Sequence, residues 1–170
     1  LKPENILVRA SGQPVLVDFG IAHLARAPGN EDHALLGTLP YMAPEQARGK
    51  NGSPLPASDQ YSLGVMLFEM LTGEPPFTGT AELVMHQHQE ADPPRPRTLN
   101  AALSRNLETI CLKCLEKEPK NRFASCQILS GDLRNAMEGS PISARPIRLP
   151  ERCWRWCRRN PRSALLASVT

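Results

Sequence analysis

The sequence predicts an α+β fold in which a mostly helical body follows a small β-hairpin. Two short apolar runs, residues 6–8 and 15–17, flank the turn-forming residues 11–14 and indicate a hairpin at the front of the chain. Several later segments carry helical patterns. The composition, 41% hydrophobic and 22% charged residues, is typical of a globular domain and excludes a disordered or fibrous chain.

Between the hairpin and the first clear helix lies a long stretch of weak periodicity, residues 20–50, in which glycine, proline and polar residues recur. Loops of this length are usually functional or disordered. Residues 59–71 are then apolar on nearly all sides, which predicts a helix buried in the middle of the body.

The rest of the body is predicted to be helical as well. Residues 81–89 form a short helix candidate, residues 92–97 a proline-rich break, and residues 103–115 place apolar side chains on one helical face. Ser125 can cap a last helix. The apolar face expected for that helix consists of Cys126, Leu129, Leu133 and Met137.

Cysteine and histidine positions raise the question of a metal site. Cys111 and Cys114 have zinc or redox spacing, but both fall on the apolar face of a predicted helix and no second ligand pair follows, so we expect core packing. We expect His86 and His88 to be surface residues, because a spacing of two does not place them on one helical face. Five cysteines at irregular spacing favour a reducing compartment over a disulfide framework.

Polar residues lie on both sides of the hairpin. A hairpin returns the chain to its starting side, so Asn5 and Asp18 should come close together, with Lys2 beside them. Amide and carboxylate oxygens suit Mg²⁺, and a lysine there would face a phosphate group. The alternative is that Lys2 and Asn5 are solvated turn residues and that Asp18 only ends a strand.

Four motifs in order carry a family resemblance: "LKPEN", "VDFG", "GTLPYMAPEQ" and "SDQYSLGVMLFEMLTGEPPF". Together they resemble the carboxy-terminal lobe of a eukaryotic-like serine/threonine protein kinase of the kind found in bacteria. The resemblance implies a protein-kinase-like fold over residues 1–137, with the amino-terminal lobe missing. Because Leu1 matches the leucine of the H-R-D-L-x-x-x-N pattern, we expect the catalytic aspartate to precede the given sequence.

The resemblance implies ATP and Mg²⁺ as cofactors and assigns roles to residues around the hairpin. Asp18 and Asn5 would hold the metal ions, and Lys2 would stabilise charge on the transferring phosphoryl group. Leu7 would be the apolar floor under adenine. Phe19 and Gly20 would complete the motif that begins at Asp18, with Phe19 packing beneath the site.

The resemblance also implies which residues accept the substrate peptide. Thr38 would hydrogen-bond to Lys2 and the missing aspartate, and Leu39, Pro40 and Tyr41 would form the surface that accepts the peptide. The lysine of "LKPEN" together with "GTLPYMAPE" is the serine/threonine style rather than the tyrosine style.

Three further residues are implied to be structural. Glu45 would form a buried ion pair with Arg122 of "KNRF". Asp59 would brace the backbone of the catalytic loop from the following helix.

The end of the chain differs in composition from the body. Residues 138–150 are proline-rich and predict a linker, and residues 151–170 carry five Lys+Arg against one acidic residue, while the body before them is nearly neutral. Arginines and tryptophans before an apolar run suggest the start of a transmembrane helix on the cytoplasmic side. A tail lying on the membrane surface or a solvated basic tail is the alternative, and nucleic acid is not expected as a partner.

The function expected from these features is transfer of the ATP γ-phosphate to serine or threonine of protein substrates by a cytoplasmic kinase domain. The 170 residues alone are expected to be inactive. The alternative is a pseudokinase or scaffold that binds partners without phosphoryl transfer, against which the intact Lys2, Asn5 and Asp18 speak. A kinase of small molecules is a second rival, which "MAPEQ" and the peptide-accepting residues disfavour.

Overall fold

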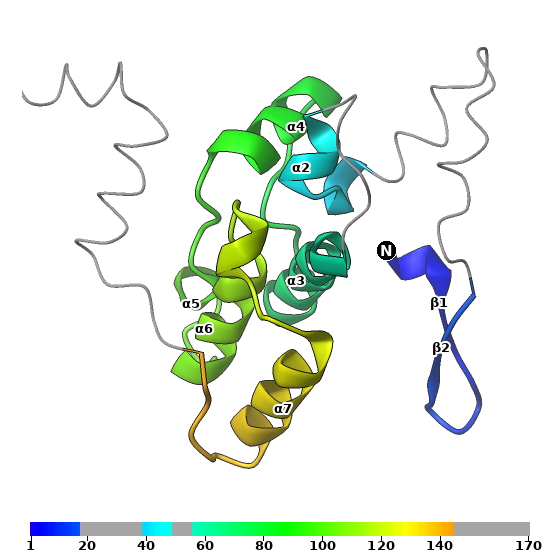
Figure 1. Cartoon of the computed structure of the whole chain (residues 1–170), viewed down its shortest axis with the longest axis vertical. Helices are drawn as coiled ribbons and strands as arrows, with labels where there is room; N and C mark the ends of the chain where they lie inside the picture. The colour runs from blue at the N-terminus through cyan, green and yellow to red at the C-terminus, as the bar shows by residue number, and fades with distance from the viewer. Residues whose placement is uncertain (18–38, 49–55, 145–170) are drawn as a thin grey trace, which may run out of the picture.

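The computed structural model describes residues 1–17, 39–48 and 56–144, in which a hairpin is followed by helices (Figure 1). The 3₁₀ helix η1 (Pro3–Asn5) leads into β1 (Ile6–Val8) and β2 (Pro14–Leu16). The predicted fold class is confirmed. The later elements are η3 (Leu39–Tyr41), α2 (Pro44–Ala47), α3 (Pro56–Thr72), α4 (Ala81–Glu90), α5 (Pro96–Leu99), α6 (Arg105–Cys114), η4 (Pro119–Asn121) and α7 (Cys126–Met137).

The hairpin pairs its two strands antiparallel, with Ile6 opposite Leu16. Gly12 takes the left-handed conformation, φ 80°, and its N–H donates to the Arg9 carbonyl at 2.8 Å, which closes the turn. The second strand begins at Pro14, one residue earlier than predicted. The hairpin stands at one side of the helical body, with the first residue toward α3 (Figure 1).

Helix α3 lies at the centre of the body, where it contacts α5, α6, η3 and η4, and α6 packs along it. Buried apolar side chains from α3, from the residue before α2, and from α6 and the residue after it form the first core cluster: Ala43, Tyr61, Val65, Phe68, Cys111 and Leu115. A second cluster joins α6 to α7 and the segment beyond it: Ile110, Cys114, Phe123, Leu129 and Ala144. The apolar pattern on nearly all sides of α3 therefore corresponds to its burial between neighbouring elements, as predicted.

The contact between α3 and α6 is close because α3 carries Gly64 at the crossing point. A Cβ atom at position 64 would lie 2.6 Å from the Cβ of Cys114, nearer than two carbon atoms can approach. Glycine lets the two backbones come together there.

Hydroxyl side chains begin three of the helices. Thr80, Ser104 and Ser125 each accept a hydrogen bond from the backbone N–H three residues later, at 3.2–3.3 Å. The predicted cap at Ser125 is confirmed.

The predicted apolar face of α7 is only partly right. Leu129 is buried and Leu133 packs against the second cluster, but Cys126 is exposed and 84% of Met137 is exposed. Met137 lies in the last turn of α7, where no other described element covers it.

The chain turns back after α7 and lies against it. Gly139 takes a left-handed conformation, φ 72°, that ends the helix. The carboxylate of Asp132, buried on α7, then accepts hydrogen bonds from Ser143 N at 2.8 Å, Ser143 Oγ at 3.0 Å and Ala144 N at 2.8 Å. Residues 140–144, within the stretch predicted as a linker, are therefore held on the body.

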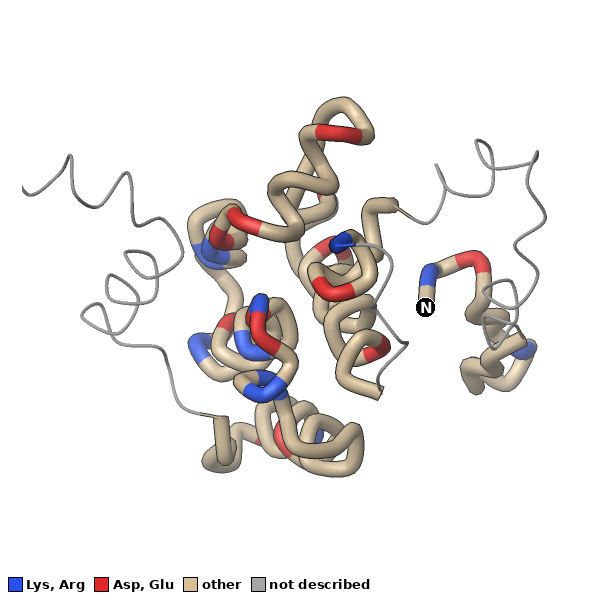
Figure 2. The backbone as a smooth tube through the Cα atoms, turned by 45° about the horizontal axis from the view of Figure 1, so that its top comes forward, with Lys and Arg blue, Asp and Glu red and all other residues tan. Residues whose placement is uncertain are grey.

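Charges are mixed along the described elements. Acidic and basic positions both occur among the described elements, although α3 and α4 carry only acidic ones, in line with the nearly neutral balance of the body (Figure 2). Within residues 1–17, 39–48 and 56–144, none of the helices has both the length and the apolar character required to span a bilayer.

Candidate active site

The first turn of the chain carries two of the predicted phosphate and metal residues, Lys2 and Asn5. Pro3 opens η1 with a φ that suits a helix start, and Asn5 N–H donates to the Lys2 carbonyl at 3.0 Å. The closed turn places Lys2 and Asn5 at the two ends of one short loop.

The hairpin then returns the chain to Asn5. Val17 N–H donates to the Asn5 carbonyl at 3.0 Å, so the residue before Asp18 lies directly beside Asn5. Asp18 itself lies outside the described residues, as do Phe19, Gly20 and Thr38. The predicted pairing of Asn5 with Asp18 requires the two ends of the hairpin to lie side by side. The described residues meet this requirement as far as Val17, the residue before Asp18.

Leu7, the predicted adenine floor, lies on β1 with 58% of its surface exposed. An exposed apolar side chain two residues after Asn5 is available to a flat apolar group. The described residues contain no cluster of three or more histidine, cysteine, aspartate or glutamate side chains that could hold a metal ion by themselves.

Asp59 lies in the first turn of α3 and faces the start of the chain. Its Oδ1 atom is 3.7 Å from the Leu1 nitrogen. The segment that carries Lys2 and Asn5 therefore begins against α3, which is the neighbourhood that the implied bracing role of Asp59 requires.

Leu39, Pro40 and Tyr41, which the sequence analysis predicts to accept the substrate peptide and which we call the peptide loop, form the 3₁₀ turn η3 and are held by α3. Leu39 is buried, and Ser62 Oγ donates to the Tyr41 carbonyl at 2.8 Å. The Tyr41 hydroxyl donates to Glu69 Oε2 at 2.9 Å. Burial and the hydrogen bond to the Glu69 carboxylate raise the pKa of Tyr41 to about 12.

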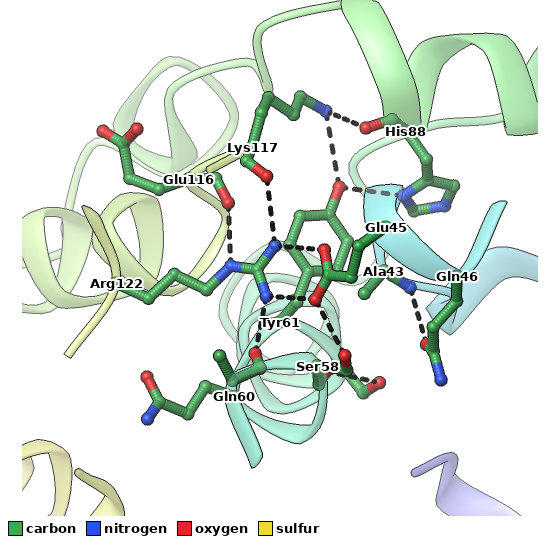
Figure 3. A network of polar contacts seen from close by, with 12 residues as sticks. Ala43, Glu45, Gln46, Ser58, Gln60, Tyr61, His88, Glu116, Lys117 and Arg122 are labelled. Atoms are coloured by element: carbon green, nitrogen blue, oxygen red, sulfur yellow. Dashed lines mark hydrogen bonds and ion pairs between the residues drawn. The ribbon is translucent and has the colours of Figure 1, made fainter. Parts of the chain in front are cut away.

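Glu45 and Arg122 meet in a network shown in Figure 3. Arg122 Nη1 lies 2.7 Å from Glu45 Oε1, and Nη2 lies 2.7 Å from Oε2. The Arg122 side chain is fully buried, and its guanidinium lies 5.0 Å from the ring centre of Tyr61. The bidentate pair joins the start of α2 to the residue after η4.

Opposing effects act on the Glu45 carboxyl. Burial alone would raise its pKa, but hydrogen bonds from Arg122 and from Ser58 Oγ, the latter at 2.8 Å, outweigh burial and lower it. Glu45 is therefore ionised at neutral pH, as a partner for a permanently charged guanidinium must be.

The prediction for His88 is wrong. His86 is exposed, but His88 is buried, with 1% of its surface exposed, and its Nδ1 lies 2.9 Å from the Tyr61 hydroxyl. The signal that would have found it is its spacing of four residues from Val84, the other buried residue of α4.

Lys117 is a second buried polar residue that the sequence did not reveal. Its ammonium donates to the backbone carbonyls of Gln87 at 3.0 Å and His88 at 2.7 Å, near the end of α4. It also donates to the Tyr61 hydroxyl at 3.4 Å and lies 4.5 Å from the centre of the Phe77 ring. A cation at the carboxyl end of a helix is favourable, because the last carbonyl groups lack partners within the helix.

The environment of His88 disfavours a second positive charge. Burial and the nearby Lys117 ammonium lower the pKa of His88 to about 4, while the backbone of Pro40 acts in the opposite direction. The imidazole is therefore neutral at physiological pH.

The prediction of core packing for Cys111 and Cys114 is confirmed. Both side chains are free thiols buried between α3 and α6, and burial raises the pKa of each. Thiols that stay protonated are poor nucleophiles and poor metal ligands.

Comparison with known proteins places this arrangement in context. The profile described as "Protein kinase domain" matches residues 1–133. The chain is 40% identical over 148 residues to serine/threonine-protein kinase PknB of Mycobacterium tuberculosis, covering 85% of this chain and 23% of that protein. It is 42% identical over 149 residues to serine/threonine-protein kinase PkaA of Streptomyces coelicolor, covering 85% and 26%. The chain thus spans about a quarter of the length of these relatives.

Proposed function

This chain belongs to the protein kinase family, and from that premise we propose that the protein transfers the γ-phosphate of ATP to serine and threonine hydroxyls of protein substrates. The observation that best supports the proposal is the bond from Val17 N–H to the Asn5 carbonyl, since it sets the residue after Val17 beside Asn5. Two serine/threonine-protein kinases at 40% and 42% identity support the choice of acceptor.

The residues at the hairpin fit Mg-ATP by their chemistry. Asn5 and Asp18 would hold Mg²⁺ through hard oxygen atoms, which this ion prefers. Leu7 offers an exposed apolar surface for adenine. When bound, the metal neutralises charge on the phosphate groups, and Lys2 adds an ammonium beside them.

The peptide loop would orient the acceptor hydroxyl. Ser62 holds its backbone at Tyr41, and Glu69 holds the Tyr41 side chain, so the loop is fixed at one end by two hydrogen bonds to α3. Phosphoryl transfer depends mainly on such positioning. Thr38, the residue before the loop, would hydrogen-bond to Lys2.

Phosphate incorporation into a generic protein substrate tests the proposal. We expect Asp18→Ala and Asn5→Ala in the full-length protein to reduce turnover by orders of magnitude, while Glu138→Ala, at an exposed carboxylate after α7, leaves it unchanged. Near-normal turnover of Asp18→Ala would remove that residue from the site. A wild-type protein that binds ATP without transferring phosphate would support the pseudokinase alternative instead.

We also propose that residues 151–170 contact a membrane and that the kinase domain lies on its cytoplasmic side. The proposal is supported by five arginines and two tryptophans in this stretch, a combination suited to anionic lipid headgroups. Co-sedimentation with anionic vesicles should be lost when the arginines are replaced by glutamine. Equal binding of both forms would contradict the proposal.

A further inference from the structure

We propose that Lys117 is a positioning residue, whose buried ammonium fixes the last turn of α4 to the core so that α4 supports the peptide loop and α2. The inference rests on the proposed kinase function for its consequence in catalysis. Its structural basis is the hydrogen bonds that Lys117 donates to α4 and to Tyr61, together with the packing of α4 against η3 and α2.

The surroundings of the Lys117 ammonium suit a cation. Only 3% of the surface of this residue is exposed. Its three N–H groups have acceptors in the carbonyls of Gln87 at 3.0 Å and His88 at 2.7 Å and in the Tyr61 hydroxyl at 3.4 Å. The ammonium also lies over the Phe77 ring, 4.5 Å from its centre. Because a buried charge is costly unless it is hydrogen-bonded, these contacts are what keep the lysine in place.

Two of the three acceptors belong to the last turn of α4. Carbonyl groups at this end of a helix lack partners further along it and carry the negative end of the helix dipole, so a cation stabilises them. Two bonds to one turn fix its direction as well as its position. Helix α4 is a single helix of ten residues, so a hold on its last turn orients the remainder.

Helix α4 is in turn a support for the predicted substrate surface. It packs against both η3, which is the peptide loop, and α2, which follows the loop (Figure 1). Ser62 and Glu69 hold Tyr41 from α3 by hydrogen bonds. The peptide loop therefore has two supports, α3 through these bonds and α4 through packing, and the second depends on where α4 is held.

The backbone of Lys117 takes part in the same arrangement. Arg122 Nη2 donates to the Lys117 carbonyl at 3.2 Å, and the same guanidinium holds Glu45 on α2 through two contacts of 2.7 Å (Figure 3). One residue thus binds α4 with its side chain and the partner of α2 with its carbonyl. Loss of the ammonium alone should release α4 and leave the Arg122 contacts in place.

The expected consequence is weaker use of the peptide with no change in the use of ATP. The residues that we propose to bind Mg-ATP, among them Lys2, Asn5 and Leu7, lie in the first turn and the hairpin, which stand at one side of the helical body and away from α4 (Figure 1). A shift of α4 should therefore reach the peptide loop before it reaches the nucleotide.

The test compares Lys117→Met, which keeps a long apolar stem but removes the charge and all donors, with Lys117→Gln, whose amide can still donate. Lys120→Met, at an exposed lysine three residues later, is the matched control. With the full-length protein, we expect Lys117→Met to raise the KM for a peptide substrate by about three- to tenfold, as for the loss of roughly one hydrogen bond, with the KM for ATP unchanged. Lys117→Gln should recover part of the loss, and Lys120→Met should show none.

Hydrogen exchange at three amides gives a measurement that does not depend on activity. Each donates to a backbone carbonyl: Ala91 N–H at 3.0 Å in the last turn of α4, Met42 N–H at 3.2 Å in the turn of the peptide loop, and Gly73 N–H at 2.7 Å in the last turn of α3. In Lys117→Met, exchange at Ala91 and Met42 should rise by about tenfold. Exchange at Gly73 should not change, and Lys120→Met should match the wild type at all three.

Several results would overturn the role of Lys117. Unchanged exchange at Ala91 would show that the lysine does not hold α4. Faster exchange at Ala91 with unchanged Met42 exchange and unchanged peptide KM would show that α4 does not support the loop. Equal increases of both KM values, or faster exchange at Gly73 as well, would indicate a general loss of structure.

Thermal unfolding of each variant shows whether it is folded. If Lys117→Met does not fold, Lys117→Gln decides by the same criteria, and failure of both to fold would overturn the proposal, since the lysine would then support the whole body. A wild-type protein without phosphoryl transfer would defeat the proposed function instead, while exchange at Ala91 and Met42 would still decide whether Lys117 holds the loop through α4.

Discussion

The Arg122 guanidinium and the Glu45 carboxylate face each other through two parallel contacts of 2.7 Å, across 77 positions of sequence. The remaining N–H groups of Arg122 donate to backbone carbonyls of Ala57 at 2.6 Å, Glu116 at 2.8 Å and Lys117 at 3.2 Å. All five donors of the buried guanidinium therefore have acceptors, and the residue ties together the starts of α2 and α3 and the segment after α6.

Replacing one partner of this pair should strongly destabilise the protein. Arg122→Leu or Glu45→Leu leaves a buried charge without its partner, which we expect to lower the free energy of unfolding by about 3–5 kcal/mol. The double variant should be less destabilised than the sum of the two, because no unpaired charge remains. Urea unfolding of the full-length protein measures this, with Arg134→Leu, at an exposed arginine on α7, as the control. Single variants within about 1 kcal/mol of wild type would contradict the prediction.

The close crossing of α3 and α6 predicts opposite effects for two glycines. Gly64→Ala places a methyl group 2.6 Å from the Cys114 Cβ, so we expect a loss of about 1–3 kcal/mol from overpacking. Gly131→Ala, in α7 with no atom within 4 Å of the new Cβ, should instead stabilise by about 0.5–1 kcal/mol. Thermal unfolding of the two variants measures these opposite effects. Equal shifts of Tm in the same direction would show that the close contact between α3 and α6 does not restrict the side chain at position 64.

Burial of a neutral His88 predicts lower stability in acid. The unfolded chain protonates this histidine near pH 6.5 and the folded chain only near 4, so the unfolded state binds more protons between these values. The contribution is complete above pH 6.5 and is lost as the pH falls to 4, by about 3 kcal/mol in total. The difference in free energy of unfolding between wild type and His88→Gln should show this slope. Parallel curves for the two proteins would contradict it.

The two tyrosines of the chain, Tyr41 and Tyr61, should both resist ionisation. Burial raises the pKa of each, to about 12 for Tyr41 and further for Tyr61. Difference ultraviolet titration of wild type against Tyr41→Phe should therefore show no phenolate at pH 10, the ordinary pKa, until urea unfolds the protein. The same shift means that stability declines as the pH rises from 10 toward 12. A midpoint near 10 for Tyr41 in the folded protein would contradict both its burial and its hydrogen bond to Glu69.

The positions of α3, α4, α6 and α7 could be predicted from the sequence because each depends on local signals, whereas α2 and α5 lie in stretches that were predicted as a loop and a proline-rich break. The period of apolar residues located α3 and α6, and hydroxyl caps marked the start of α7. Boundaries moved by a few residues at most, as at β2, where Pro14 joins the strand. Apolar periodicity and helix caps depend on residues that lie within one or two helical turns of each other, so they can be recognised from the sequence alone.

The polar contacts of the core could not be predicted in the same way, because their partners are far apart in sequence. Gln60 exchanges two hydrogen bonds of 3.1 Å with the backbone of Phe123, and nothing near Gln60 announces it. From the sequence alone, Lys117 would be taken for an exposed lysine, because its acceptors on α4 and Tyr61 are known only from the structure. The Glu45 and Arg122 pair was expected only through the family resemblance.

The hydrogen bonds to the Asp132 carboxylate make residues 140–144, which follow α7, part of the folded body. The proline-rich composition gave no sign of this, since the attachment depends on one buried side chain that accepts three hydrogen bonds from Ser143 and Ala144. These bonds outweigh burial and lower the pKa of Asp132, so the carboxylate is ionised at neutral pH.

Asp132→Ala should release this segment. Removal of the acceptor leaves both backbone N–H groups free to exchange, and we expect hydrogen exchange at Ser143 and Ala144 to rise by about tenfold or more, because bonds to a charged acceptor contribute roughly 1.5–3 kcal/mol. Ser143→Ala removes only the hydroxyl bond and should have a much smaller effect, because the two backbone bonds remain. Exchange at these two amides that is equally fast in the wild type and in Asp132→Ala would show that residues 140–144 are not held by this contact, and Ile142 and Ala144 would then not belong to the second core cluster in solution.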